Sequence, residues 1–372
     1  MIMKKGIFMA AMALSGLASC GNPSEEVRIV VGTYGDNIYM YSFDSEAIEK
    51  GHAFKEEASA EARNASYALA NKRSDGSVDV YAVSETGMGS GAYSFVLDGE
   101  ADMEMTAERR ETGDDPCFVL LHKGLMMTAD YSGGSVSVFP IEDDGSIGGM
   151  CQQLTFMGSG PVAGRQEGSH IHQLRVMPGS GEWILASDLG ADMIRLLRLS
   201  EDGLTHVCDI ECPEGSGPRH MEFGKDGKHL YCICELSGEV LVYGIDHASD
   251  DVQPQFRPIQ RILADEVNAG GSADIHIHPD GTHIYTSHRL DNDGISIFRT
   301  LPDGTLEKTG YARTARHPRN FMISPDGTLL LVACRDDKVI QVFRIGKDGG
   351  LTLAPSVLRF GNDMPSSVTI ID

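Results

Sequence analysis

The chain has 372 residues, 41% of them hydrophobic, with 43 Gly and 15 Pro, so it is turn-rich and long enough for one large folded body or two ordinary domains. Its 31 Lys and Arg are opposed by 54 Asp and Glu, which gives a net charge of -23 with histidine neutral. Such a field repels phosphate backbones and anionic lipid surfaces, so we expect no nucleic-acid partner, and any anionic ligand needs a local cluster of arginines.

The first twenty residues are similar to a lipoprotein signal. Lys4 and Lys5 precede an apolar run that is too short to span a bilayer comfortably and that ends in the letters LASC at 17–20. These letters resemble the lipobox of bacterial lipoproteins, which implies cleavage before Cys20 and lipid attachment to its thiol; a buried N-terminal helix is the alternative. We expect a signal peptide over 1–19, a lipid-anchored tether over 20–27, and a location in the cell envelope, at the outer membrane or the periplasmic face.

A pair of strand-like runs recurs along the rest of the chain. Apolar and polar residues alternate in these runs, and the second run of each pair begins at 38, 92, 135, 193, 239, 294 and 339. The spacings of 54, 43, 58, 46, 55 and 45 residues separate seven copies, each rich in strand and turn signals. We therefore predict an all-β fold, a seven-bladed β-propeller.

The two ends of the chain complement each other. Most copies have an earlier strand followed by a Pro-Asp-Gly type of turn, as in ADIHIHPDGTHIY at 273–285, but the first copy lacks this strand. The last residues, PSSVTIID, look like the missing strand. Pairing them with the first copy would close the ring and hide two sheet edges, so we predict one domain over 28–372.

The cysteine count does not indicate a full set of disulfides. Without Cys20, seven of the 8 Cys remain, an odd number that cannot all pair, and no C-x-x-C occurs. Cys232 and Cys234 flank a single strand residue, where a bridge is geometrically awkward. We expect free thiols, with a bridge between Cys208 and Cys212 as the alternative.

Alignment of the copies predicts which side chains meet. The start of the first strand and the end of the returning strand lie on one face of the ring. The aligned starts are Cys117, His172, Arg219, Ala273, Arg319 and Ser366, and the aligned ends are Tyr34, Glu85, Tyr131, Leu189, Glu235, Arg289 and Arg335. Four arginines at one channel mouth predict an anion site, because the planar guanidinium suits a carboxylate or a phosphate. Alternatively, the charges are solvated or pair with one another, as Arg289 with Glu235.

Three stretches carry a resemblance to a known family. DYSGGSV at 130–136, DLGAD at 188–192 and GPRH followed by ELSG at 217–238, in this order and at blade spacing, resemble the seven-bladed propeller lactonases. That family contains the propeller-type 6-phosphogluconolactonases and the fungal carboxy-muconate cyclising enzymes. The resemblance covers nearly all of the mature chain. It implies a lactonase, a carboxylic ester hydrolase, and it places His172, Arg219, Glu235 and Arg289 at the family's active-site positions, each with the matching residue type.

Roles follow from that resemblance. Arg219, Arg289 and Arg319 would bind the phosphate or carboxylate of the substrate. Glu235 or His172 would be the general base for a water molecule that attacks the lactone carbonyl. No serine or cysteine nucleophile is needed, and no G-x-S-x-G motif is present.

Other residues of the mouth have less specific roles. His220 or an arginine would stabilise the tetrahedral oxyanion. The further candidates for substrate contact are His170, Asn320, Arg335, Glu85 and Tyr131. We expect no cofactor, a small anionic lactone or sugar acid as the partner, and a monomer. Because a lipid-anchored enzyme would not meet cytoplasmic 6-phosphogluconolactone, a non-phosphorylated sugar lactone is an alternative substrate; an isomerase acting on a dicarboxylate and a non-catalytic binding module are alternative functions.

Two H-I-H triplets raise the question of a metal. Histidines at i and i+2 of a strand share one face, a spacing that zinc or copper can use. No third ligand with suitable spacing accompanies His170 and His172, or His276 and His278, so we expect no metal. The alignment places the second pair about 10 to 17 Å deeper than the mouth, beside the Pro-Asp-Gly turn. We interpret that pair as structural, with His276 kept as a reserve candidate because the family tends to carry histidine there.

Overall fold

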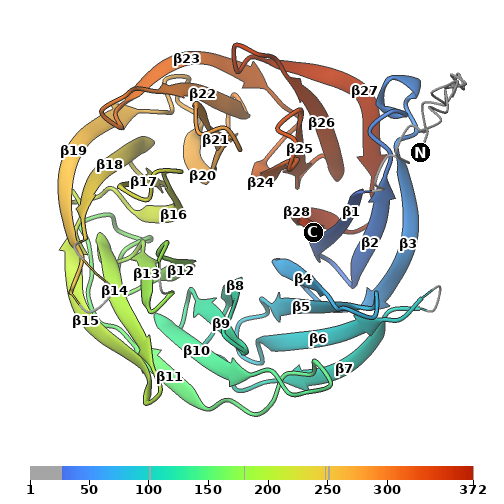
Figure 1. The fold of residues 1–372 in the computed structure, drawn as a ribbon, viewed down its shortest axis with the longest axis horizontal. Coiled ribbons are helices and arrows are strands. Elements are labelled where there is room, and N and C mark those ends of the chain that lie inside the picture. Colours follow the sequence, from blue (N-terminus) through green and yellow to red (C-terminus); the bar gives the residue numbers. More distant parts are fainter. Residues whose placement is uncertain (1–26, 100–101, 180, 248, 250–251, 372) are drawn as a thin grey trace, which may run out of the picture.

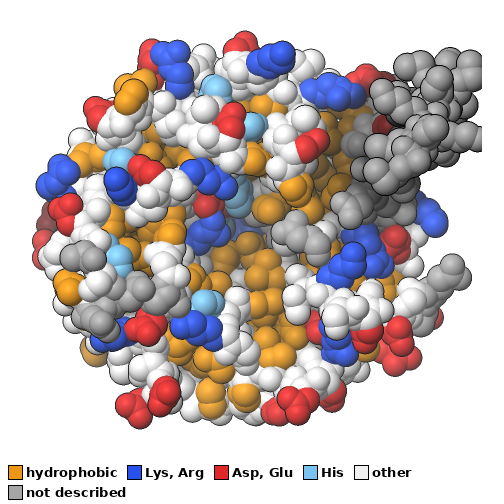
Figure 2. Space-filling model, viewed as in Figure 1, with side chains coloured by type: hydrophobic (Ala, Val, Ile, Leu, Met, Phe, Trp, Pro, Cys, Tyr) orange, Lys and Arg blue, Asp and Glu red, His pale blue; other side chains and the backbone are white. Residues whose placement is uncertain are grey.

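The computed structural model describes residues 27–99, 102–179, 181–247, 249 and 252–371. These residues form seven four-stranded antiparallel sheets arranged in a ring (Figure 1), and the centre of the ring is hollowed into a channel (Figure 2). The predicted all-β propeller with seven blades is therefore confirmed. In the described part of the chain the only helical element is the 3-10 turn η1 (Ile48–Lys50), and no helix is long and apolar enough to cross a membrane. The predicted signal peptide and Cys20 lie outside the described residues.

The strands of each blade are given from the channel outward. Blade 1 consists of β28 (Met364–Ile371), β1 (Val27–Tyr34), β2 (Asn37–Phe43) and β3 (Phe54–Glu61). Blade 2 consists of β4 (Ala68–Lys72), β5 (Val78–Ser84), β6 (Gly91–Leu97) and β7 (Glu104–Arg109). Blade 3 consists of β8 (Pro116–His122), β9 (Leu125–Asp130), β10 (Ser135–Pro140) and β11 (Gln152–Thr155). Blade 4 consists of β12 (Ile171–Val176), β13 (Trp183–Asp188), β14 (Met193–Ser200) and β15 (Gly203–Glu211). Blade 5 consists of β16 (Pro218–Phe223), β17 (His229–Cys234), β18 (Glu239–Asp246) and β19 (Gln255–Leu263). Blade 6 consists of β20 (Gly270–Ile277), β21 (His283–Leu290), β22 (Gly294–Thr300) and β23 (Leu306–Arg313). Blade 7 consists of β24 (Pro318–Ile323), β25 (Leu329–Cys334), β26 (Val339–Ile345) and β27 (Leu351–Arg359).

The ring is closed by the two ends of the chain. β28 is the innermost strand of blade 1 and pairs antiparallel with β1, from Arg28 opposite Ile371 to Tyr34 opposite Met364. This pairing is the predicted closure: it places β1 between β28 and β2, so β1 has no free edge, and it joins the two ends of the chain in one sheet. Because β1 runs toward the mouth, Val27 lies at the opposite, far face of the ring.

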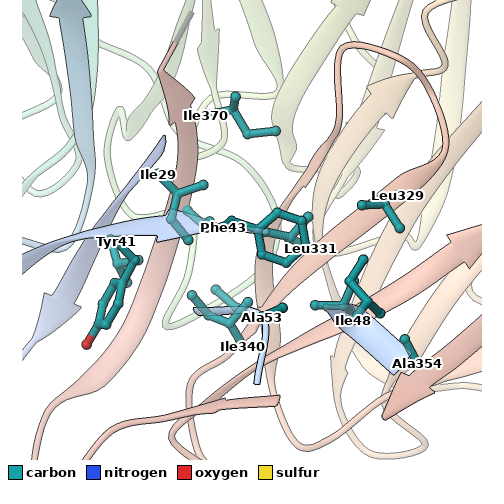
Figure 3. Packing of buried hydrophobic residues seen from close by; sticks show 14 of the residues in the cluster. Ile29, Tyr41, Phe43, Ile48, Ala53, Leu329, Leu331, Ile340, Ala354 and Ile370 are labelled. Carbon is teal, nitrogen blue, oxygen red and sulfur yellow. The ribbon is translucent and has the colours of Figure 1, made fainter. Parts of the chain in front are cut away.

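The hydrophobic core lies between blades. Where blade 7 meets blade 1, Ile29 and Phe43 pack with Leu331 and Ile340, and all are almost fully buried (Figure 3). All residues of the middle strands β5 and β25 are buried, because the sheets are covered on both faces. Such packing is as dense as a crystal of small molecules, so it fixes the strand ends that carry the polar side chains.

A β-bulge recurs at the start of the inner strands. The pairing between the first two strands of a blade skips one residue, and the skipped residues are Cys117 in blade 3, His172 in blade 4, Arg219 in blade 5, Arg319 in blade 7 and Ser366 in blade 1. A bulge bends its strand and re-aims the extra side chain. The aligned starts predicted from the sequence are therefore one repeated backbone feature at the channel mouth.

The cysteine thiols are free. Cys208 and Cys212, the pair considered for a bridge, are both unpaired, as are the five other cysteines of the described residues. Cys232 and Cys234 are buried in the core. The protein therefore does not rely on a disulfide in this part of the chain.

Candidate active site

A buried carboxylate organises the mouth of the channel. Glu235 follows β17 directly, is 7% exposed, and accepts hydrogen bonds from three guanidinium groups. Arg219 Nε is 2.8 Å and Arg289 Nη2 2.7 Å from Glu235 Oε2. Arg165 Nη2 is 2.6 Å from Oε1. The structure thus brings together three of the four residues placed at the family's active-site positions and adds Arg165 to them.

The electrostatics of Glu235 fit an anchor better than a base. Burial alone would raise the pKa of this carboxyl, but the charges of Arg289, Arg219 and Arg165 outweigh burial and hold the pKa far below its usual range. Both of its oxygens accept charge-assisted hydrogen bonds. A carboxylate in this state has little tendency to take a proton from water.

Sequence reasoning missed Arg165, because the blade alignment compared strands only. Arg165 lies in the long loop between β11 and β12, within the widest of the six spacings, 58 residues, and this length was the available signal. The next residue, Gln166, fixes the loop by donating from Nε2 to Leu189 O and to Asp192 Oδ1, both at 2.8 Å. Arg165 is 40% exposed, whereas the side chains of Arg219 and Arg289 are buried.

Beneath the arginines, the inner strands enclose a narrow hollow with room for about one water molecule. Its lining residues are Ser66, Tyr67, Cys117, His172, Arg219, His220, Arg319, Asn320 and Ser366. The rings of His172 and His220 lie edge to face with centroids 5.1 Å apart. Three polar atoms of this lining are buried without a hydrogen-bond partner: Nδ1 of His172, Nε2 of His220 and Oγ of Ser66. Buried polar groups are almost always satisfied, so this hollow is suited to a water molecule or a polar substrate atom.

Both histidines of the hollow are neutral near pH 7. Burial, and after it the positive charge of Arg219, lowers the pKa of His172 well below its usual value. The same two causes, in the same order, lower the pKa of His220 to about 4, although Asp274 opposes them. Each ring therefore keeps one nitrogen lone pair that can accept a proton.

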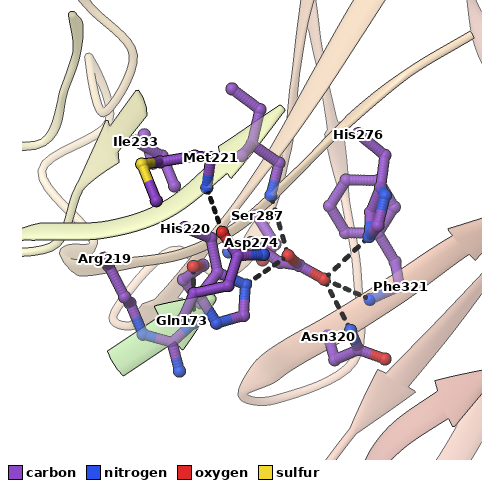
Figure 4. A network of polar contacts seen from close by, with 12 residues as sticks. Gln173, Arg219, His220, Met221, Ile233, Asp274, His276, Ser287, Asn320 and Phe321 are labelled. Carbon is purple, nitrogen blue, oxygen red and sulfur yellow. Dashed lines mark hydrogen bonds and ion pairs between the residues drawn. The ribbon is translucent and has the colours of Figure 1, made fainter. Parts of the chain in front are cut away.

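Figure 4 shows the polar network behind His220. Asp274, on β20, is 1% exposed and accepts from His220 Nδ1 at 2.6 Å. Asn320, on β24, donates from Nδ2 to Asp274 at 2.6 Å and accepts from the amide of Val368 at 2.8 Å. Asn320 thus joins blades 6, 7 and 1 and borders the hollow.

Glu85 and Arg335 lie at the rim, near Tyr34, and Arg319 extends from the lining of the hollow to the same tyrosine. Tyr34 donates to Glu85 at 2.6 Å, and the Arg319 guanidinium lies 5.2 Å from the Tyr34 ring centroid. Arg335 is more peripheral: it is 6.0 Å from the same ring and forms an ion pair with Asp336 at 2.7 Å. These contacts hold Glu85, Arg319 and Arg335 on the side of blades 1, 2 and 7.

Blades 3 and 4 contribute an aromatic pair. The rings of Tyr131 and His170 stack with centroids 4.4 Å apart and planes 8° apart, and His170 Nδ1 donates to the Tyr131 carbonyl at 2.8 Å. Arg165 Nη2 is 3.4 Å from the Tyr131 hydroxyl. The stacked pair forms a wall beside Glu235 and His172.

The second H-I-H triplet lies deeper in the channel. His276 is 3.2 Å from Asp274 and 3.6 Å from Glu222. His278 contacts Gly327 O at 2.8 Å and Asp280 at 2.7 Å, in the turn region. Within the described ranges no group of three or more His, Cys, Asp and Glu is placed to hold a metal ion.

The local charge is opposite to that of the whole protein. Arg165, Arg219, Arg289 and Arg319 surround the two carboxylates Glu235 and Glu85, while the histidines of the hollow are neutral. Figure 2 shows the hollowed centre of the molecule, with basic side chains and histidines on the side of β16 and β20. Burial lowers the pKa of Arg289, and the neighbouring guanidinium groups of Arg219 and Arg319 lower it further. Glu235 raises this pKa but does not offset the other effects, so the negative charge of Glu235 does not fully balance the positive charges around it. The site therefore favours an anion.

The fold and this mouth define a seven-bladed propeller with a cluster of arginines at one opening of its channel. The family described as "Lactonase, 7-bladed beta-propeller" matches residues 28–369, and the chain belongs to this family. A 6-phosphogluconolactonase of Formosa agariphila is 33% identical over 68% of this chain and 73% of its own length. Two solved structures are also similar. A putative 6-phosphogluconolactonase of Bacteroides fragilis has 36% identity and a TM-score of 0.85, covering 94% of this chain and 100% of that one. A periplasmic gluconolactonase of Pseudomonas aeruginosa has 26% identity and a TM-score of 0.82, covering 93% and 99%.

The predicted family is thus confirmed, and with it the prediction that the chain is an enzyme of the lactonase type. The roles of the individual residues stay predictions. Of the residues predicted to contact substrate, His220, Arg319 and Asn320 border the hollow, whereas His170, Tyr131, Glu85 and Arg335 form its rim.

Proposed function

We propose that this protein hydrolyses an anionic sugar lactone at the channel mouth, in the manner of the 6-phosphogluconolactonases. The observation that carries the proposal is the carboxylate of Glu235, which holds three guanidinium groups directly above two neutral, buried histidines. The arginines would bind the phosphate or carboxylate of the substrate, and the histidines lie where the reacting ester would be.

Water activation falls to an imidazole in this proposal. Two bases were predicted from the sequence. Both oxygens of Glu235 accept hydrogen bonds from arginines, whereas His172 is neutral and its Nδ1 has no hydrogen-bond partner. An anionic substrate beside Arg219 and Arg289 would offset their charges and so raise the proton affinity of His172 when catalysis needs it.

The reaction needs no covalent intermediate. Water adds through oxygen to the lactone carbonyl carbon while His172 takes one of its protons. A guanidinium stabilises the tetrahedral oxyanion, an effect of the order of 10²-fold or more. Collapse re-forms the carbonyl and breaks the ring C–O bond, the leaving alkoxide takes the proton from His172, and a hydroxy acid is released.

A lactone panel tests the proposal. The panel holds 6-phosphogluconolactone, gluconolactone and lactones without a sugar, and hydrolysis is measured as acid release above the uncatalysed rate. We expect H172Q to lower kcat by about 10²- to 10⁴-fold, because it removes the base. We expect R289K to lower kcat/KM by about 10- to 100-fold, because it removes charged hydrogen bonds to the substrate.

Arg299 provides the matched control. It is an exposed arginine that pairs with Glu307, so R299K should leave turnover unchanged. If no lactone is opened but an anion raises the melting temperature, the protein is a binding module and the proposal is wrong. A preference for gluconolactone over its 6-phosphate would assign the non-phosphorylated substrate.

A further inference from the structure

Asp274 is a buried carboxylate of the channel that accepts five hydrogen bonds. Its Oδ1 accepts from His220 Nδ1 at 2.6 Å and from the amide of Ile275 at 2.9 Å. Its Oδ2 accepts from Asn320 Nδ2 at 2.6 Å, from the amide of Phe321 at 3.2 Å, and from His276 Nε2 at 3.2 Å. Burial opposes the charge, yet His276 and His220 hold the pKa of Asp274 well below its usual value, so this side chain is an acceptor only.

This arrangement fixes the tautomer of His220. Because Asp274 only accepts, the contact at 2.6 Å requires a proton on His220 Nδ1. Since the ring is neutral, Nε2 carries no proton, and this nitrogen is buried without a partner. In this tautomer His220 has no N–H bond directed to the hollow, so the arrangement favours a proton acceptor over the oxyanion-stabilising role considered for His220 in the sequence. It presents a lone pair to the hollow, with a carboxylate behind it, as a general base does.

We propose that His220 is a second catalytic imidazole of the lactonase reaction, with Asp274 as the positioning residue that keeps its Nε2 free of a proton. The inference rests on the proposed function. The attacking water would lie in the hollow with one O–H bond directed to His172 and the other to His220 Nε2. Its lone pair then faces the arginines, where the lactone carbonyl would bind.

The two imidazoles divide the two protons of the water. His172 takes the first on attack and returns it to the ring oxygen as the C–O bond breaks. The second stays on the attacking oxygen, which becomes the hydroxyl of the new carboxylic acid. His220 Nε2 accepts this proton as the acid ionises, and then passes it to solvent when the carboxylate leaves.

Two substitutions and one control test this assignment. H220Q keeps a polar side chain but cannot take a proton, so kcat should fall by about 10²-fold or more while KM for the turned-over lactone changes little. D274N permits the other tautomer and should lower kcat similarly. H206Q is the matched control: His206 lies on the outer strand β15, where it is partly exposed and pairs with Asp209, so this substitution should retain kcat to within a few fold.

A spectroscopic readout separates positioning from folding. In the 15N spectrum of histidine-labelled protein, the His220 signals, assigned by their loss in H220Q, should show a protonated Nδ1 and a bare Nε2 at neutral pH. In D274N the proton should no longer be confined to Nδ1. If D274N does not fold, H220Q still decides, because it leaves the carboxylate and its other partners in place.

The outcomes separate this inference from the proposed function. Wild-type turnover with an unchanged kcat in H220Q would overturn the role of His220 and leave the lactonase function standing. A protonated Nε2 in the wild-type spectrum would overturn the role of Asp274. A wild-type protein that opens no lactone would overturn both proposals together.

Discussion

At the scale of single residues, Glu235 shows that the sequence predicts where a side chain lies but not whether it is free to accept a proton. The repeat alignment placed Glu235 beside Arg289 and left open whether the glutamate pairs with arginine or acts as a base. The contacts with Arg219, Arg289 and Arg165 favour the first role, because they occupy both oxygens. Sequence spacing locates a side chain on a strand, but its proton affinity depends on neighbours from other blades and loops.

Glu235→Gln tests that role. Removing one partner of a buried ion pair leaves uncompensated charge, so we expect E235Q to lose about 3–5 kcal/mol of unfolding free energy at pH 7, together with lactone turnover. The pKa of Glu235 is depressed in the folded state, so its contribution is present above the ordinary glutamate pKa and is lost as the pH falls below it. Urea unfolding at pH 7 and near pH 4 should show a smaller difference between wild type and variant at the lower pH. Unchanged stability with abolished turnover would instead identify Glu235 as the base.

At the scale of strands, the bulges explain why the alignment located the mouth. Each inner strand begins with a residue that the pairing skips, such as His172 or Arg219, and a skipped residue in equivalent blades occupies an equivalent place. The position one residue further on was harder to interpret. His220 and Asp274 follow Arg219 and Ala273, and their contact joins blades 5 and 6. No spacing within one blade indicates a hydrogen bond between two blades, so Asp274 was missed.

The same joint between blades 5 and 6 predicts a pH effect at His276. Although burial opposes its charge, Asp274 and Glu222 raise the pKa of His276 to about 9. A folded-state pKa above the ordinary value near 6.5 stabilises the protein fully below about pH 6.5, and this contribution is lost as the pH rises through 9. We expect H276Q to cost of the order of 2 kcal/mol at pH 6 and little at pH 9.5. Equal losses at both pH values in thermal or urea unfolding would show that the histidine contributes packing only.

At the scale of the whole molecule, the closed ring was predictable because its signals are periodic and local. Alternating strands, turn residues and a spare terminal strand determine seven blades and their closure, and the pairing of β28 with β1 follows. The loop between β11 and β12, which supplies Arg165, has no period, so its path had no signal except its length. The site combines both kinds of information: a predictable frame and one arginine from an unpredictable loop.

The ring also sets how a lipid anchor would present the site. β1 begins at Val27 on the far face and ends at Tyr34 at the mouth, so a chain attached through Cys20 enters from the side opposite the active site. The seven Cα-to-Cα steps from Cys20 to Val27 reach at most about 25 Å when extended, which would hold the far face near the membrane and turn the mouth toward solvent. We expect Cys20→Ala to move the protein from the membrane fraction to the soluble fraction, because it removes the thiol to which the lipid would be attached. Lactone turnover by the released protein should match that of the anchored form, since a mouth facing away from the membrane gains no access on release. A variant that stays with the membrane would contradict the anchor, and a marked rise in kcat/KM on release would contradict the orientation.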